Sequence, residues 1–304
     1  MKTSVIMSTF NGEDYILEQL NSLYDQDMPA NEVLIFDDCS TDNTPIIISR
    51  FIQEKNLRNW FLHINTHNKG WRKNFMCGMS QAHGDYIFPC DQDDIWEPCK
   101  IREMVKVMEC NSDIALLTSN YCAFFDNGSH AIGPNKENLK IIRPNLGKKL
   151  FYIRYPGCTY CIRRTFFCSI KNYWVPTDAH DGFVWKYAMM GKSIAFYNKT
   201  LIKWRKHDDS TGTLESYALK TANGKYSFIV SALQVLGKML VYFDKEKNEK
   251  AVKIIQLNIR CYQLRKNFYE TKNPLIALQL LRYIDCYPKT KQYLGDLYLV
   301  YLSK

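Results

Sequence analysis

Short apolar runs alternate with amphipathic helical patterns through the first 120 residues. Five runs have the length and apolar content of buried strands, and they cover residues 3–8, 32–38, 60–65, 86–89 and 114–119. The segments between them carry apolar side chains at helical spacing, as Ile16, Leu20 and Leu23 do. This alternation predicts an α/β fold with a mostly parallel central sheet and helices on both of its faces.

Polar side chains follow the predicted strands at their carboxyl ends. Thr9 and Asn11 follow the first strand, Asp38 ends the second, Asn68 follows the third, and the acidic segment "DQDD" of residues 91–94 follows the fourth. Ligands of such sheets bind beyond the carboxyl ends of the strands. We therefore expect these side chains to converge on one rim of the sheet.

The acidic segment calls for a cation. Asp91, Asp93 and Asp94 repel one another unless positive charge lies among them. Neither G-x-G-x-x-G nor the P-loop pattern is present, so a glycine-rich loop is not expected to hold a phosphate. A divalent metal would pair with carboxylates on one side and a diphosphate on the other, and magnesium or manganese suits such oxygen ligands. Capping of the next helix is the structural alternative, but a cap needs one carboxylate, not three.

The last third of the chain has a different character. From about residue 214 the pattern is helical, and residues 214–304 hold 15 Lys/Arg against 7 Asp/Glu, whereas residues 1–213 hold 25 against 24. A basic tail suggests an anionic surface, and a solvated face explains the charge equally well. The segments "RKNFYETK" and "KQYLGDLYLVYLSK" combine basic and aromatic residues. Peripheral membrane attachment, packing on the first domain and homodimerisation are alternatives for this region.

Length and composition narrow the class of protein. A chain of 304 residues suits one large α/β domain plus an appendage. No run of eighteen apolar residues occurs and the start lacks a secretory pattern, so we expect neither a transmembrane helix nor export. The eleven cysteines are dispersed and fit reduced core thiols of a cytoplasmic protein.

Several motifs in order carry a family resemblance. They are "STFNGEDYILEQLNSLYDQ", "IFDDCSTDNT", "NKGWRKNF", "DQDDIWEPCKI", "GCTYCIRR", "HDGFVWKYAMMGK" and "LIKWRKH". With these motifs the chain resembles family 2 glycosyltransferases of the GT-A fold, especially bacterial rhamnosyltransferase-type members. The resemblance implies a catalytic domain over residues 1–213, with a nucleotide-binding half at 1–120 and an acceptor half at 121–213. Residues 214–304 would form a helical C-terminal extension.

The resemblance also implies roles for individual residues. Asp91, Gln92 and Asp93 match the family's D-x-D motif, in which Asp93 would hold the metal while Asp91 and Gln92 face the donor. His207 would complete the metal shell, and a surface histidine is the equal alternative. Thr9, Asn11, Asp38 and Asn68 match positions around the nucleoside. Asp181 matches the catalytic base, with Asp178 as a weaker candidate.

The implied activity is an inverting transfer of a sugar from a nucleotide-diphospho-sugar to an acceptor hydroxyl in bacterial surface polysaccharide synthesis. The acceptor would be a saccharide or a lipid-linked saccharide, and the location would be the cytoplasm or the inner face of the cell membrane, with no role for nucleic acid. A sugar nucleotidylyltransferase is one alternative, but it would carry a glycine-rich, arginine-containing loop after the first strand. A non-catalytic polysaccharide-binding protein is another, but it would not need Asp91, Asp93 and Asp181 at separate strand or loop ends.

Overall fold

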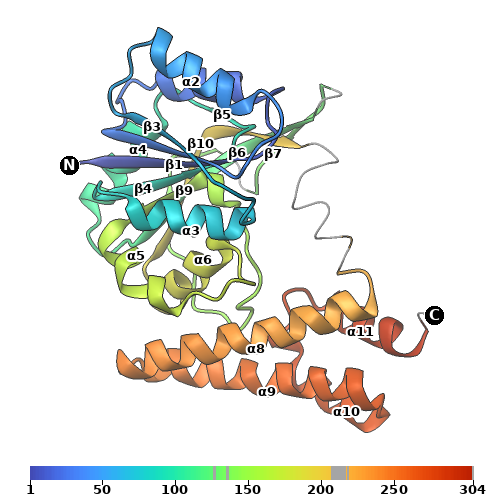
Figure 1. The fold of residues 1–304 in the computed structure, drawn as a ribbon. Coiled ribbons are helices and arrows are strands. Elements are labelled where there is room, and N and C mark those ends of the chain that lie inside the picture. The colour runs from blue at the N-terminus through green and yellow to red at the C-terminus, as the bar shows by residue number, and fades with distance from the viewer. Residues whose placement is uncertain (126–127, 135–136, 207–216, 218, 303–304) are drawn as a thin grey trace.

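The computed structural model describes residues 1–125, 128–134, 137–206, 217 and 219–302. A ten-stranded sheet carries helices on both faces, and a further layer of helices lies below it (Figure 1). The strands are β1 (Thr3–Thr9), β2 (Glu32–Asp37), β3 (Trp60–Ile64), β4 (Tyr86–Cys90), β5 (Ile95–Trp96), β6 (Leu116–Phe125), β7 (His130–Ile132), β8 (Ile141–Ile142), β9 (Tyr160–Arg163) and β10 (Ile194–Lys206). The helices of the α/β part are α1 (Ile16–Tyr24), α2 (Thr44–Glu54), α3 (Trp71–Gln81), α4 (Lys100–Cys110), α5 (Arg164–Ile170) and α6 (His180–Met190), with short 3-10 turns η1 (Gly157–Thr159) and η2 (Lys171–Tyr173).

The sheet is parallel in its first half and mixed in its second. Strands β3, β2, β1 and β4 run side by side in the same direction, with Thr9 opposite Asp37 and Met7 opposite Cys90. Strand β9 then lies between β4 and β6 and is antiparallel to both, while β10 runs parallel to β6 and pairs with the antiparallel β5. The parallel arrangement expected for the first four strands is therefore found, but the expected mostly parallel sheet is a mixed one.

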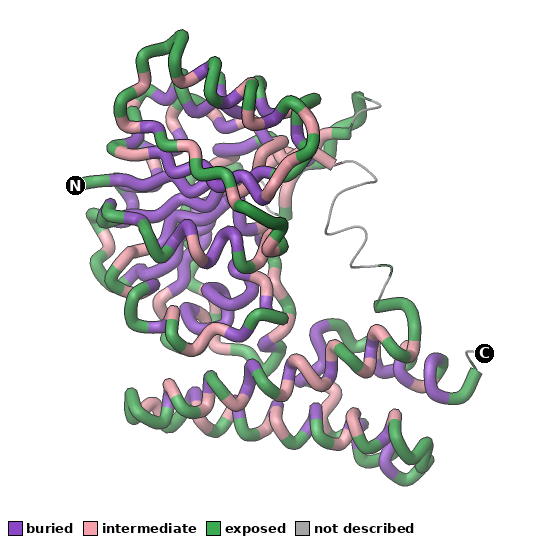
Figure 2. Tube along the Cα trace, in the orientation of Figure 1, coloured by how far each residue is buried: buried purple, intermediate pink, exposed green. Residues whose placement is uncertain are grey.

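Two apolar layers enclose the sheet. One face packs against α1, α2 and α4 through residues such as Ile16, Ile48 and Met104. The other face packs against α3, α5 and α6 through residues such as Met76 and Val184. Figure 2 shows the buried positions concentrated along the strands and on the inward sides of these helices.

The C-terminal helices pack beneath α6. They are α8 (Ala222–Lys245), α9 (Glu249–Thr271), α10 (Pro274–Leu280) and α11 (Lys291–Tyr301), with the 3-10 segment η3 (Leu281–Cys286). The apolar layer under the sheet continues into α8 and α9. Aromatic pairs join the two parts: the ring of Tyr187 lies 5.2 Å from that of Tyr242 and 5.8 Å from that of Phe243, and Phe151 lies 5.0 Å from Tyr262. We call these five residues the aromatic seam.

A buried ion pair lies inside the C-terminal helices. The Nε and Nη2 atoms of Arg265 on α9 donate to the carboxylate of Asp296 on α11 at 2.8 and 3.1 Å. The hydroxyl of Tyr269 donates to the same carboxylate at 3.0 Å. Both charged side chains are 1% exposed or less, so each charge depends on partners within the protein in place of water.

Helix α8 is long and apolar enough to cross a membrane by length and composition alone. The expectation from apolar run length did not single it out. About 33% of its most apolar window is buried against the rest of the structure, and a core helix of a soluble protein would meet the same criterion.

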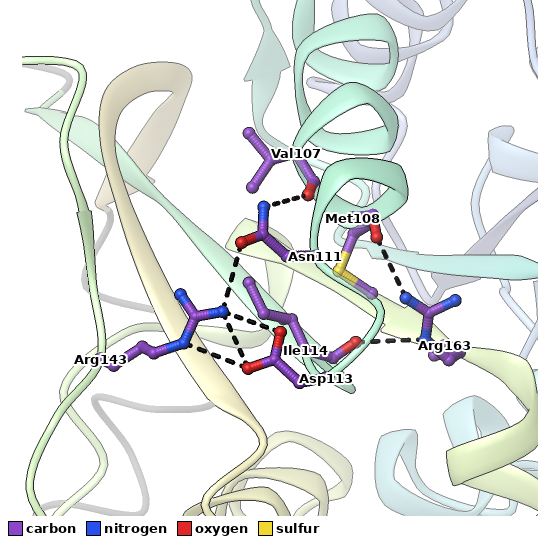
Figure 3. A network of polar contacts seen from close by, with 7 residues as sticks. All are labelled: Val107, Met108, Asn111, Asp113, Ile114, Arg143 and Arg163. Atoms are coloured by element: carbon purple, nitrogen blue, oxygen red, sulfur yellow. Dashed lines mark hydrogen bonds and ion pairs between the residues drawn. The ribbon is translucent and has the colours of Figure 1, made fainter.

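Polar contacts stabilise the segments around the amino end of β6 (Figure 3). The Nη2 atom of Arg143 donates to Asp113 at 2.8 Å and to Asn111 at 3.2 Å. Arg163 donates to the carbonyl oxygens of Ile114 and Met108, both at 3.1 Å. We call this the back-edge network, because β6 runs in the same direction as β4 and its amino end lies opposite the predicted rim.

Candidate active site

The loops after β1 and β2 hold each other by hydrogen bonds. Thr9 is 1% exposed, and its hydroxyl donates to Asp37 Oδ2 at 2.9 Å. The backbone N–H of Asn11 donates to Ser40 Oγ at 2.9 Å, and the side-chain oxygen of Asn11 accepts from Thr41 N at 2.9 Å. Thr9 and Asn11 thus shape this part of the rim through contacts within the protein.

Asp38 presents an unused carboxylate oxygen at the end of β2. Its Oδ1 accepts from Asn65 Nδ2 and from the backbone N–H of Lys69, both at 2.8 Å. Its Oδ2 is buried and has no hydrogen-bond partner among the described residues. A buried acceptor without a donor is costly, and a bound ligand would supply one. Asn68 is exposed in the adjoining loop, where its side chain accepts from Gly70 N at 2.9 Å.

Gln92 clamps the first loop onto the acidic segment. Its Oε1 accepts from Phe10 N at 2.8 Å, and its Nε2 donates to Phe10 O at 3.0 Å. A Cβ at Gly12 would lie 2.5 Å from the carboxamide of Gln92, so this approach requires a glycine. The clamp fixes the position of Asp91 and Asp93 relative to the loop after β1.

We call Asp91, Asp93 and Asp94 the acidic cluster. Ligand atoms of Asp91, Asp94 and the buried Cys158 all lie within 4.8 Å of one another. Removal from water, together with the charges of Asp93 and Asp181, raises the pKa of Asp91 to about 7. Burial also raises the pKa of Asp94 well above its usual range, with Asp93 and Asp91 adding to the effect. Carboxylates that resist ionisation in this way fit a divalent cation, which would favour their charged forms.

Arg205 connects β10 to the acidic cluster. Its backbone N–H donates to Asp94 Oδ1 at 3.0 Å, and its Nε donates to the carbonyl of Asp93 at 2.8 Å. Its guanidinium also pairs with Glu18 on α1. This residue sets the path of the segment that follows β4.

Two lysines lie next to the cluster. Lys100 is fully buried, its ammonium donates to Cys158 O at 2.5 Å and lies 4.0 Å from the centre of the Trp96 ring, and burial lowers its pKa to about 8. Burial also lowers the pKa of Lys206, although the carboxylates of the cluster act in the opposite direction. The two lysines offset part of the negative charge of the acidic cluster. The charge that remains could bind a further cation.

Asp181 lies in the first turn of α6, where its Oδ1 accepts from Gly182 N at 2.6 Å. Its charge contributes to the raised pKa of Asp91, which indicates that the two carboxyl groups lie near one another. A Cβ at Gly157 would lie 2.8 Å from His180 Nε2 and 2.9 Å from the Asp181 Cβ. The absence of a side chain at Gly157 therefore lets the start of α6 approach η1 and the end of β4.

The neighbours of Asp181 are fixed by packing and pairing. His180 is stacked on Phe75 with ring centres 4.0 Å apart, and burial lowers its pKa to about 4. Neither ring nitrogen of His180 has a hydrogen-bond partner within the part of the chain that the structure describes. Asp178 is held at 2.8 Å by Lys186 in a buried pair. Asp178 is the second candidate for the catalytic base, and its pairing with Lys186 makes it the weaker of the two.

The rim brings the predicted residues together from separate strands. Strand β1 lies between β2 and β4, so Asp38 and Asp91 follow strands two spacings apart, or about 10 Å. Asp93 and Asp181 both act on Asp91. His207 lies outside the described residues.

Some residues of the site were not predicted from the sequence. Arg205 and Lys206 stand within the "LIKWRKH" motif, but basic residues at the end of a strand do not reveal which acid they meet. Lys100 gave no signal, because lysine is usually exposed. Cys158 stands in a Cys-x-x-Cys pattern with Cys161, but the second half of a zinc site is missing, so the pattern did not indicate a metal ligand.

Comparisons with known proteins identify the family of the chain. The family model described as "Glycosyl transferase family 2" matches residues 4–169. The dTDP-rhamnosyl transferase RfbG of Shigella flexneri is 28% identical over 219 residues, which are 67% of this chain and 72% of that protein. The poly(ribitol-phosphate) β-N-acetylglucosaminyltransferase TarS of Staphylococcus aureus is 37% identical over 120 residues. Those residues are 38% of this chain and about a fifth of TarS, 21% of its length.

Solved structures share the fold. The structure of residues 1–349 of S. aureus TarS in complex with UDP superposes with a TM-score of 0.64 at 18% identity, covering 98% of this chain and 90% of that one. The mannosyltransferase PcManGT from Pyrobaculum calidifontis, in complex with GDP-Man and Mn2+, superposes with a TM-score of 0.55 at 14% identity, covering 100% and 88%. The resemblance predicted from the motifs is confirmed, and the chain belongs to glycosyl transferase family 2, as a glycosyltransferase with the GT-A fold.

Proposed function

We propose that this enzyme transfers a sugar from a nucleotide-diphospho-sugar to an acceptor hydroxyl in surface polysaccharide synthesis, with inversion at the anomeric carbon. The observation that carries the proposal is the gathering of Asp91, Asp93 and Asp181 at the end of β4. The names of the relatives support the class of reaction, because RfbG is a dTDP-rhamnosyl transferase and TarS acts on poly(ribitol phosphate). The acceptor would be a saccharide or a lipid-linked saccharide.

The donor would lie across the ends of β2, β1 and β4. The free Oδ2 of Asp38 would accept a hydrogen bond from the base or the ribose. Asn68 borders the same end of the rim, and Asp91 the diphosphate end. Thr9, Asn11 and Gln92 would act mainly by holding the two loops in place, since their side chains are bonded within the protein.

A divalent metal would be held by the acidic cluster, where ligand atoms of Asp91 and Asp94 lie close together beside Cys158. The part of Asp93 as a ligand is proposed from its place in the D-x-D motif. When bound, manganese or magnesium would stabilise the negative charge that develops on the leaving diphosphate. His207 remains a proposed further ligand. Lys206 and Lys100 would contribute fixed positive charge to the same region.

Asp181 would act as the general base. The acceptor oxygen forms the new bond to the anomeric carbon, the bond from that carbon to the diphosphate breaks, and the acceptor proton moves to the Asp181 carboxylate. The first turn of α6 holds this carboxylate, and the packed His180 limits its motion. Burial disfavours the protonated form of His180 and lowers its pKa to about 4, so His180 is a weak alternative base.

The test is the Asp181→Asn variant. We expect turnover to fall by about 10²–10⁴-fold while donor binding and thermal stability stay unchanged, since general bases contribute rate enhancements of that size. Release of nucleoside diphosphate measures turnover, and calorimetry measures donor binding. The matched control is Asp178→Asn, which should lower stability more than the turnover of folded enzyme, because it breaks the pair with Lys186. Turnover retained in Asp181→Asn would refute the assignment.

For location, we propose a cytoplasmic enzyme in peripheral contact with the inner membrane face. Leu275, Leu278 and Leu281 are exposed at helical spacing on α10 and its continuation, next to the basic Arg282. Replacement of Leu275 and Leu278 by Glu should reduce sedimentation with phosphatidylglycerol vesicles, and unchanged sedimentation would contradict the contact.

A further inference from the structure

A pocket outside the acidic rim lies among the C-terminal helices. Its volume is about 690 Å³, within the range of small-molecule sites. Three tyrosines and two lysines stand among its lining residues, which also include Thr221, Asn223, Leu299 and Val300. The tyrosines are Tyr226, Tyr269 and Tyr298, and the lysines are Lys220 and Lys272. The two basic, aromatic segments noted in the sequence thus each contribute to the wall of one cavity.

The aromatic wall is held in place by its hydroxyl groups. Tyr269 donates to Asp296 at 3.0 Å, and Tyr226 donates to Glu270 at 2.6 Å. The two rings lie with their centres 6.5 Å apart. Tyr298 is 57% exposed at the mouth. Rings fixed in this way provide flat apolar surface at little entropic cost, which suits contact with a sugar ring.

The charge around the pocket is positive. Neither Lys220 nor Lys272 forms an ion pair with a described residue, and the ammonium of Lys220 lies 4.3 Å from the centre of the Tyr217 ring. Lys225, 7% exposed on α8, adds a buried cation close by. The neighbouring acids are already engaged, since Asp296 is paired with Arg265 and Glu270 accepts from Tyr226 and lies 3.6 Å from Lys266 Nζ. Excess cations around a hollow attract an anion.

The helices that line the pocket lie on the side of the molecule that the rim faces. In Figure 1 the start of α8 and all of α11 lie on the side of the molecule toward which the carboxyl ends of β1 and β4 point. A chain that leaves the acidic rim on this side would extend toward α8 and α11.

We propose that this pocket binds a phosphate-bearing saccharide, as an accessory site for the acceptor chain. The tyrosine rings contact the sugar, and Lys220 and Lys272 bind the phosphate. The acceptor role rests on the proposed function, whereas binding in the pocket does not require turnover.

The test measures the binding of glucose 1-phosphate to the full chain by calorimetry at low salt. We expect binding that weakens with added salt, and that Lys220→Gln with Lys272→Gln lowers affinity by about tenfold or more, since charge-assisted hydrogen bonds of this kind are removed. Tyr298→Ala should lower affinity severalfold, and it keeps the result interpretable if the double variant folds poorly. The matched control is Lys289→Gln with Lys291→Gln on the same helical unit, which should leave binding unchanged.

The outcomes separate this site from the acidic rim. Binding that survives Asp93→Asn but falls in the pocket variants supports the proposal, even if transfer activity is never found. Binding lost in Asp93→Asn and kept in the pocket variants overturns it. Equal affinity for inorganic phosphate and glucose 1-phosphate overturns the saccharide part. Pocket-dependent sedimentation with phosphatidylglycerol vesicles, without binding of glucose 1-phosphate, would assign the pocket to lipid and also overturn it.

Discussion

The acidic cluster at the rim and the Arg265–Asp296 pair in the C-terminal helices both place charged groups away from water. The two charges of the pair compensate each other, whereas those of the cluster do not. Arg265 and Asp296 carry opposite charges and share two hydrogen bonds. Asp91, Asp93 and Asp94 have the same sign, and the nearby lysines and Arg205 offset them in part. Removal of one partner from a balanced buried pair destabilises the fold, because the other charge is then buried without compensation. An unbalanced cluster costs stability and is suited to a charged ligand.

The largest expected effect is the loss of the balanced pair. Asp296→Asn leaves Arg265 charged and buried, and it should lower the free energy of unfolding by about 3–5 kcal/mol. Urea denaturation measures this change, and the turnover of the remaining folded enzyme should be unaltered. The control is Arg143→Gln in the exposed part of the back-edge network, where we expect no measurable change. Recovery of stability in Arg265→Met with Asp296→Leu would show that the stranded charge was the cause.

A smaller effect follows from pH at His180. The folded pKa of about 4 lies below the ordinary value of 6.5, so the unfolded chain takes up a proton that the folded protein refuses. The contribution of neutral His180 to the free energy of unfolding is fully present above pH 6.5 and is lost as pH falls toward 4. Between pH 7.5 and 5 the wild type should lose about 1–2 kcal/mol relative to His180→Phe, which cannot titrate. Parallel pH profiles of the two proteins in thermal unfolding would contradict the buried neutral histidine.

The smallest effect should have the opposite sign. Asp94→Asn keeps an oxygen for the backbone N–H of Arg205 and removes one of the crowded charges. We expect a gain in unfolding free energy of about 1 kcal/mol near neutral pH, together with weaker binding of Mn2+. Chemical denaturation and the electron paramagnetic resonance signal of free Mn2+ measure the two quantities. If Asp94→Asn destabilises the protein, the charges of the acidic cluster are compensated as well as those of the Arg265–Asp296 pair, and the comparison fails.

The sequence predicted the strands that can be recognised from a short run of consecutive residues. Strands β1, β2 and β4 are buried along nearly all of their length, so they appear as apolar runs, and their polar ends indicated the rim. The short strand β5, which pairs with β10 before α4 begins at Lys100, is not among the five predicted strands. Insertion of β9 between β4 and β6 depends on contacts far apart in the chain, which no local period reveals.

The same distinction applies to the candidate site. The carboxylates were recognised because Asp91, Asp93 and Asp94 stand in one short motif. Their partners were not, because Arg205 is more than 100 positions away and Cys158 more than 60. Sequence patterns identified the charges that need compensation, and only the fold shows which residues provide it.

The aromatic seam has a consequence for exchanging parts between relatives. Because Phe151 and Tyr187 insert their rings among those of the two long helices, a cut made in the segment before α8 would open the apolar layer beneath the sheet to solvent. A chimaera that borrows a donor-side half from another enzyme would thus have to inherit both sides of the seam, and acceptor preference would be re-engineered more safely by surface substitutions than by grafting.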